Sequence, residues 1–253
     1  MASYQSYVIC TCPRSGSTLL CRLLAATGTA GNPDSYFHSP SLNDWWDDLA
    51  LPPTRPQSEV EMLGTIFAAA REQGTTNTGI FGLRLQRHSF DFFIEKTGVL
   101  FPGLSSDAER FEAAFGATLF IYLTRENKLE QAISYVKASQ TGLWHQAPDG
   151  TELERLSAPQ EPVYDGGKIA QHLNELTALD EGWRDWFTQE SINAMRITYE
   201  ELSADPTTVL ATILEQLGLD AATAKGIDPG VAKLADAISR NWAERFLAEQ
   251  VTG

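Results

Sequence analysis

The apolar positions of the chain follow two spacings that alternate along the sequence. Short runs of consecutive apolar residues predict strands covered on both faces, and the clearest, 117–123, is almost wholly apolar. Longer stretches repeat their apolar residues every three or four positions, as amphipathic helices do. The predicted strands are 8–12, 78–85, 117–123 and 194–199, and the predicted helices are 17–27, 59–73, 90–96, 106–115, 127–140, 167–189, 206–218 and 237–249.

This alternation of strands and helices predicts the fold class. It is typical of a three-layer α/β fold of the P-loop type, in which a central, mainly parallel sheet is flanked by helices. The sequence shows no linker, internal repeat or low-complexity tract, so we expect a single domain over 1–253. Residues 142–162 are polar and irregular, which predicts a surface loop.

The turn after the first predicted strand has the outline of a phosphate-binding loop. Residues 11–18 read Thr-Cys-Pro-Arg-Ser-Gly-Ser-Thr. Against the pattern G-x-x-x-x-G-K-[ST], Gly16 and Thr18 match, but Ser17 replaces the lysine that grips a terminal phosphate. Backbone N–H groups and the helix N-terminus still favour a phosphate or sulfate, and Arg14 supplies charge. The alternative is an ordinary capped strand-to-helix turn.

A second predicted strand also ends at an arginine. The strand 117–123 runs into Arg125, and a helix follows at once. Ligands of doubly wound sheets bind at the carboxyl ends of the strands, so Arg125 lies near Arg14 if the two strands are parallel neighbours. The alternative is a surface ion pair between Arg125 and Glu126 or Glu130.

Charge and cysteine content restrict the partners and the compartment. The net charge is −14, from 33 acidic and 19 basic residues, which argues against nucleic acid or an anionic membrane as a partner. The three cysteines, Cys10, Cys12 and Cys21, form a poor disulfide framework and lack a later partner pair for a metal, so we expect a cytoplasmic protein without a metal ion. No apolar run is long enough for a membrane span.

An anionic ligand must therefore meet a local cationic pocket. The candidate cations are Arg14, Arg22, Arg84, Arg87, Arg125 and Lys137.

The motifs together resemble the sulfotransferases that use 3′-phosphoadenosine 5′-phosphosulfate (PAPS). The resemblance lies in the loop 13–18, in the block 131–135, and in Arg125 with Ser134 nine residues later. The sequence is most similar to the bacterial trehalose 2-sulfotransferase family, and the similarity runs from Tyr7 to about Glu249. Further shared segments are 26–28, 30–33, Gln140-Thr141 with Trp144, 182–187, and Trp242 with Arg245.

This resemblance implies a reaction and a donor site. The reaction is transfer of a sulfuryl group from PAPS to a hydroxyl of a carbohydrate or glycolipid-like acceptor, without a metal. A loop without the lysine fits this donor, which carries no terminal triphosphate. The family also implies a possible homodimer. The residues implied to bind the donor are Arg14, Ser15, Gly16, Ser17 and Thr18 at the 5′-phosphosulfate, and Arg125 and Ser134 at the 3′-phosphate.

The acceptor side departs from the family. In the trehalose-specific relatives a glutamate after Ala-Gly-x-Pro acts as general base, and Ser35 stands at its position here. His38 and Asp34 are the alternatives, and the pKa of a histidine favours His38. Both could instead be loop residues that contact the substrate or cap a turn. Arg14 is implied to stabilise the charge on the leaving group.

The loop around Ser35 also carries the predicted acceptor contacts. Aromatic rings would stack on the faces of a sugar, and polar side chains would bind its hydroxyls. Trp45 is implied as a sugar contact by alignment, whereas Phe37 is expected to be structural. The predicted acceptor-binding residues are Pro13, Asn32, Pro33, Asp34, Ser35, Tyr36, His38 and Trp45.

Two other functions fit parts of the sequence. A P-loop kinase of a small metabolite would share the loop and the sheet, but Ser17 replaces its lysine and no predicted strand ends in the aspartate that holds Mg²⁺. A catalytically silent nucleotide-binding relative would keep the donor site and lack the base.

Overall fold

Four parallel strands form the central sheet of the described chain, which covers residues 4–147, 149–228, 230 and 236–252 of a computed structural model. β1 pairs with β2 on one side and with β3 on the other, and β6 extends the sheet beyond β3. The two strands that lead to Arg14 and Arg125 are therefore parallel neighbours, which is the condition under which we expected Arg125 to lie near Arg14. In sheet order the strands are β2 (Phe81–Gln86), β1 (Ser6–Thr11), β3 (Thr118–Thr124) and β6 (Met195–Thr198).

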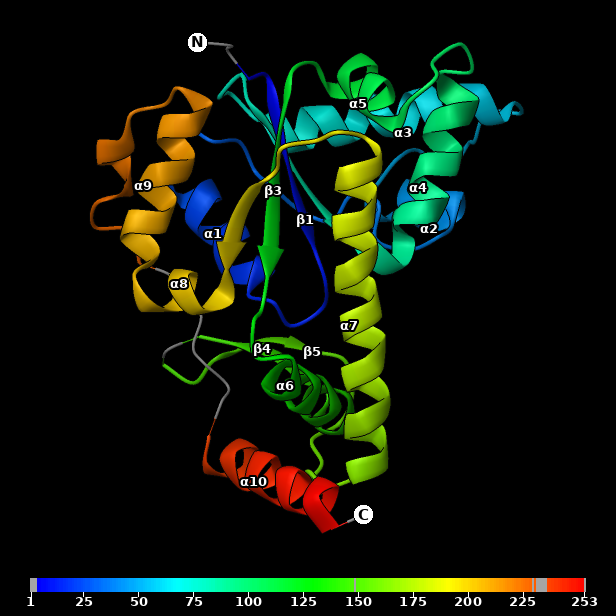
Figure 1. The fold of residues 1–253 in the computed structure, drawn as a ribbon. Helices are drawn as coiled ribbons and strands as arrows, with labels where there is room; N and C mark the ends of the chain where they lie inside the picture. The colour runs from blue at the N-terminus through cyan, green and yellow to red at the C-terminus, as the bar shows by residue number, and fades with distance from the viewer. Residues whose placement is uncertain (1–3, 148, 229, 231–235, 253) are drawn as a thin grey trace.

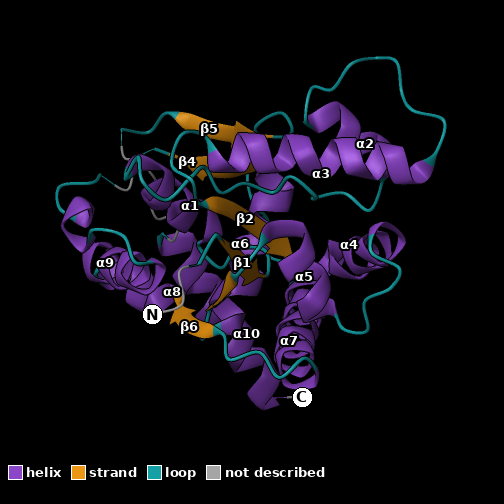
Figure 2. Ribbon diagram, turned by 90° about the horizontal axis from the view of Figure 1, so that it is seen from above, coloured by secondary structure: helices purple, strands orange, loops and turns teal. Residues whose placement is uncertain are grey.

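Helices cover both faces of this sheet, which confirms the predicted three-layer α/β fold (Figures 1 and 2). The side chains of β1 alternate between the layers: Tyr7 and Ile9 face one core, and Val8 and Cys10 face the other. One face packs against α1 (Ser17–Ala26) and α9 (Pro206–Leu217), and the other against α3 (Glu59–Thr75), α4 (Arg87–Leu100), α5 (Asp107–Phe115) and α7 (Gly166–Gln189).

The predicted loop 142–162 is wrong in part, because it contains an antiparallel hairpin of β4 (Leu143–Gln146) and β5 (Glu152–Arg155). Both strands are short and partly exposed, so they lack the apolar run of a buried strand. Three short elements were also missed: α2 (Leu42–Asp48), α8 (Tyr199–Ala204) and the 3₁₀ turn η1 (Ala221–Ala224).

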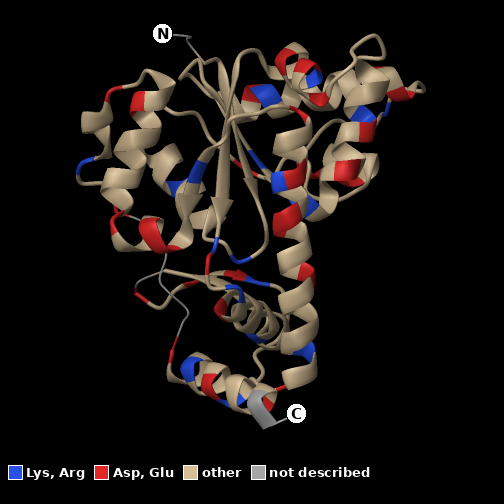
Figure 3. Ribbon diagram, viewed as in Figure 1, with Lys and Arg blue, Asp and Glu red and all other residues tan. Residues whose placement is uncertain are grey.

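The remaining helices lie beyond the carboxyl ends of the strands. Figure 1 shows α6 (Lys128–Thr141), the hairpin and α10 (Ala237–Thr252) below the sheet, on the side to which its arrows point. Figure 3 shows Lys and Arg positions in the chain between the sheet and α6. Within the described ranges, no helix has the length and apolar character needed to cross a membrane.

Candidate active site

A cavity of about 1240 Å³ opens at the carboxyl ends of the strands. Its walls include residues from the segment 11–18, which we call the first loop. Further walls come from α6, α7 and α8 and from the β4–β5 hairpin. Most of the residues predicted for the donor meet here, which agrees with the position of ligand sites in parallel α/β sheets. The predicted donor residues that line it are Arg14, Gly16, Ser17, Thr18, Arg125 and Ser134.

Buried hydrogen bonds hold the backbone of the first loop. The Thr11 hydroxyl donates to the carbonyl of Leu123 over 2.9 Å and is hydrogen bonded to the Ser15 hydroxyl. The Trp183 indole donates to the carbonyl of Thr11, and the Gln131 amide donates to the carbonyl of Pro13. Ser15 is fully buried and turned inward, so its side chain supports the loop from beneath.

Gly16 lets the chain turn from this loop into α1. Its φ of 86° lies in the left-handed region, and no side chain caps the helix that follows. A Cβ at this position would lie 2.6 Å from Cδ2 of Tyr199. The first N–H groups of α1 are thus left for an anion, and a Cβ at position 16 would fit only if the Tyr199 ring shifted.

Replacing Gly16 by alanine is expected to lower the free energy of unfolding by about 1–3 kcal/mol, because a left-handed alanine is strained and its Cβ meets Tyr199. Urea unfolding measures the loss. Gly28→Ala is the matched control, since Gly28 has a φ of 66° but no described atom within 4 Å of the added Cβ. Equal losses in the two variants would contradict a steric role for Tyr199.

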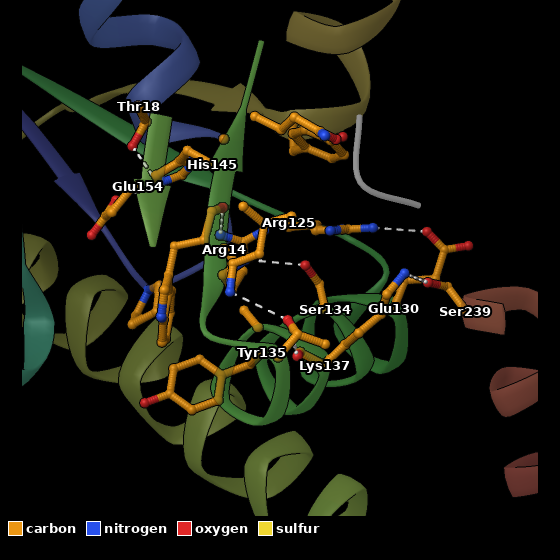
Figure 4. Close-up of a pocket in the computed structure, with 18 of the residues that line it drawn as sticks. Arg14, Thr18, Arg125, Glu130, Ser134, Tyr135, Lys137, His145, Glu154 and Ser239 are labelled. Carbon is orange, nitrogen blue, oxygen red and sulfur yellow. Dashed lines mark hydrogen bonds and ion pairs between the residues drawn. The ribbon is translucent and has the colours of Figure 1, made fainter. Parts of the chain in front are cut away.

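Arg14 projects from the loop into the cavity. Its Nε donates to Ser134 Oγ over 3.0 Å (Figure 4), and its Nη1 donates to the carbonyl of Trp144 over 2.6 Å. Burial, followed by the charge of Arg125, lowers the pKa of Arg14 to about 10, so the guanidinium remains charged at neutral pH. No carboxylate among the described residues forms an ion pair with Arg14, and its charge is left for a ligand.

Arg125 lies at the end of β3 and is only 6% exposed. Its guanidinium lies 4.5 Å from the ring centroid of Tyr199, and its Nη2 donates to Glu130 over 2.8 Å. The ion pair with Glu130 that the sequence suggested is therefore present. It is not a surface ion pair, because Arg125 is buried although Glu130 is exposed. The buried Nε has no hydrogen-bond partner among the described residues. Such an unpaired donor costs about 1–3 kcal/mol, which an anion at this position would recover.

Arg84, in the second half of β2, connects the first loop to the predicted acceptor loop. Its Nε donates to Ser35 Oγ over 2.7 Å, and its Nη1 donates to Thr18 Oγ1 over 3.0 Å. Its Nη2 lies 3.2 Å from Asp34 Oδ1. The carboxylate of Asp34 is thus already paired, and it lines a separate small cavity of about 240 Å³ with Ser35 and Tyr36.

The other predicted acceptor residues fall in different places. Pro13 and His38 line the large cavity, where the rings of His38 and His88 meet edge to face at 5.1 Å. Asn32 is exposed, its carbonyl accepts a hydrogen bond from Tyr36, and Pro33 is buried.

Trp45 does not line either of these cavities. It is fully buried, packs against Phe37 and Phe92, and donates its indole N–H to the carbonyl of Ser39. The sugar contact that the alignment predicted at Trp45 is therefore wrong for this structure, because Trp45 is a core residue.

His145 of β4 is a site residue that the sequence analysis missed, because it lies in the segment predicted as a loop. Its Nε2 lies 3.0 Å from Thr18 Oγ1 and 3.4 Å from Glu154 Oε2. Burial, then the charges of Arg14 and Arg84, lower the pKa of His145 to about 4. His145 is therefore neutral at pH 7, and its contact with Glu154 is not an ion pair at that pH.

The lowered pKa of His145 predicts a pH dependence of stability. Between pH 6.5 and about 4 the unfolded chain binds a proton here that the folded chain does not, so stability falls as the pH falls through this window. The free energy of unfolding of His145→Gln is expected to fall by roughly 2 kcal/mol less than that of the wild type between pH 7 and pH 4.5. Urea unfolding at the two pH values measures the difference. An unchanged pH dependence in the variant would contradict a neutral, buried His145.

The fold and the cavity together define an α/β protein of the P-loop type with an arginine-lined cavity at the carboxyl edge of its sheet. The chain belongs to the Stf0 sulphotransferase family, whose family model matches residues 6–249.

Individual relatives agree with this assignment. The chain is 29% identical to a trehalose 2-sulfotransferase of Mycolicibacterium smegmatis, over 95% of this chain and 94% of the relative. It is also 29% identical to a trehalose 2-sulfotransferase of Mycobacterium tuberculosis, over 96% of this chain and 94% of the relative. A solved structure of a sulfotransferase from Alicyclobacillus acidocaldarius aligns with 100% of this chain and 94% of the solved chain, at 16% identity and a TM-score of 0.46. This superposition is too loose to add to the assignment.

Proposed function

We propose that this protein transfers a sulfuryl group from PAPS to a hydroxyl group of a carbohydrate or glycolipid-like acceptor. The observation that carries the proposal is the pair of guanidinium groups, Arg14 and Arg125, at the ends of adjacent parallel strands in one cavity. Arg14 has no carboxylate partner among the described residues, and the Nε of Arg125 is unpaired although its Nη2 contacts Glu130, which favours an anion that reaches both guanidinium groups. The names of the relatives support a sugar as acceptor.

The donor site fits such a ligand. The first loop and the uncapped start of α1 would hold the 5′-phosphosulfate, with N–H groups from Gly16 onward. The unpaired Nε of Arg125 would donate to the 3′-phosphate, and Ser134 would add a hydroxyl. Bound there, PAPS would supply the sulfuryl group and a phosphate leaving group.

The chain supplies charge stabilisation and a proton acceptor. Arg14 lies in the loop where negative charge would grow, and a preorganised cation in a buried site stabilises such charge without reorganisation. We assign the general base to His38, because it lines the cavity while Asp34 is tied to Arg84. The proton would pass from the acceptor hydroxyl to the imidazole of His38.

We further propose that residues 1–253 form a single domain of a cytoplasmic protein that assembles as a homodimer. All three cysteines are buried and unpaired, which suits a reducing compartment. The residues that the structure describes hold no cluster of three or more ligating side chains for a metal ion. The reaction we propose uses none.

Transfer of ³⁵S from labelled PAPS to a panel of neutral mono- and disaccharides tests this function. We expect label in the sugar fraction, unchanged by EDTA, and no phosphate transfer from ATP. Transfer from ATP that EDTA abolishes would replace the proposal with a P-loop kinase. Binding of adenosine 3′,5′-bisphosphate without turnover of any acceptor would identify a catalytically silent relative.

A further inference from the structure

One wall of the cavity is aromatic, and its side chains are not among those proposed to bind the donor. Tyr135 of α6, Trp144 of β4 and His172 of α7 line it, together with Glu175, which lies one turn beyond His172 on α7. We call these four residues the aromatic wall. Because they come from three elements that meet at the cavity, their positions depend on the tertiary fold.

Contacts between these side chains hold the wall in one arrangement. The rings of Tyr135 and Trp144 meet edge to face at 5.5 Å, and the rings of Tyr135 and His172 lie 4.5 Å apart. His172 Nδ1 lies 2.8 Å from Glu175 Oε2, and Gln171 donates to the other oxygen of Glu175. The wall thus combines ring faces with an oriented carboxylate.

The wall lies directly beside the proposed reaction centre. The guanidinium of Arg14 is 5.7 Å from the ring centroid of Trp144, and its Nη1 donates to the carbonyl of the same residue. Tyr135 also follows Ser134, which accepts from Arg14, on α6 (Figure 4). A ligand on the wall would therefore lie next to the first loop.

The chemistry of the wall matches a neutral sugar. Tyr and Trp present large apolar faces, on which the C–H face of a pyranose ring can lie, and the carboxylate of Glu175 accepts hydrogen bonds from hydroxyls. The same carboxylate repels phosphate and sulfate. The cavity of about 1240 Å³ exceeds the roughly 300–1,000 Å³ of a pocket for one small ligand, so it has room for an acceptor beside the donor.

We propose that the aromatic wall is the acceptor site and that it binds a neutral pyranose ring of a mono- or oligosaccharide. This inference rests on the proposed function and adds the residues that select the acceptor. It also replaces Trp45, which is buried in the core, with Trp144 as the stacking tryptophan.

Two pairs of variants test the wall, with trehalose and maltose as probes. Tyr135→Ala and Trp144→Ala are expected to raise the KM for the disaccharide about tenfold or more, while Tyr135→Phe and Trp144→Phe keep a ring and stay within about threefold of the wild type. The Kd of adenosine 3′,5′-bisphosphate, measured by calorimetry, is expected to stay within twofold in all four. Tyr199→Ala is the donor-side control and should weaken that Kd, because its ring covers Arg125.

The outcomes separate the wall from the donor site. Loss of adenosine 3′,5′-bisphosphate binding in the alanine variants of the wall would assign it to the nucleoside of the donor and overturn the inference. Unchanged KM values, or a wild-type enzyme that binds the nucleotide and turns over neither disaccharide, would also overturn it. Failure of the wild type to bind adenosine 3′,5′-bisphosphate would instead overturn the proposed function itself.

Discussion

Replacing Arg125 by alanine is expected to weaken the binding of adenosine 3′,5′-bisphosphate about a hundredfold. The guanidinium is buried on Tyr199, and its Nε lacks a partner in the described chain, so an anion gains at least one strong bond there. A hydrogen bond to a charged group contributes about 1.5–3 kcal/mol, and each 1.4 kcal/mol changes affinity tenfold. Isothermal titration calorimetry of the purified variant measures the change.

Two further variants sharpen this prediction. Arg184→Ala removes an exposed arginine that pairs with Glu181 outside the cavity and should leave the affinity unchanged. Glu130→Gln removes the carboxylate that pairs with Arg125 and should raise the affinity several-fold, because the anion no longer competes with it. Wild-type affinity in Arg125→Ala would show that the 3′-phosphate binds elsewhere.

Arg14→Ala is expected to lower kcat by about 10²–10³-fold, as the loss of one donor to a developing oxyanion does in other enzymes. The variant removes the cation of the loop and its two hydrogen bonds to Ser134 and Trp144. Single-turnover rates with saturating donor and acceptor measure the effect on the chemical step.

Arg14→Lys separates the effect of the positive charge from that of the two hydrogen bonds of the guanidinium. Lysine keeps the positive charge but cannot form the two-point contact of a guanidinium, so an intermediate rate is expected. Circular dichroism of both variants checks that the fold is retained. A kcat within threefold of the wild type in Arg14→Ala would contradict the assigned role.

The fold could be predicted where burial determines the pattern. β1 and β3 are covered on both faces, so their apolar runs are continuous, and their parallel direction follows from the alternation of strands and helices. The hairpin could not be predicted in this way, because β4 and β5 are short, partly exposed and mostly polar. α8 carried a usable signal that was missed, the capping box of Thr198 and Glu201.

The meeting of the arginines that we propose for the donor could be predicted, because it depends on the ends of parallel strands. Arg14 and Arg125 follow two neighbouring parallel strands, Arg84 lies near the end of a third, and this topology brings them to one edge of the sheet. The acceptor side of the cavity depends on the direction in which side chains of short helices, hairpins and loops point. The local sequence pattern does not predict that direction. Trp45 lies on a short helix that packs inward, whereas Trp144 lies on a hairpin at the cavity.

Equilibrium urea unfolding with adenosine 3′,5′-bisphosphate tests the donor site most directly. At a hundredfold excess over its Kd the nucleotide should raise the free energy of unfolding of the wild type by roughly 2.7 kcal/mol, and at the same concentration it should raise that of Arg125→Ala by only about 0.4 kcal/mol. An unfolding curve of the wild type that the nucleotide does not shift would contradict the PAPS site, and equal shifts in both proteins would contradict its placement at Arg125.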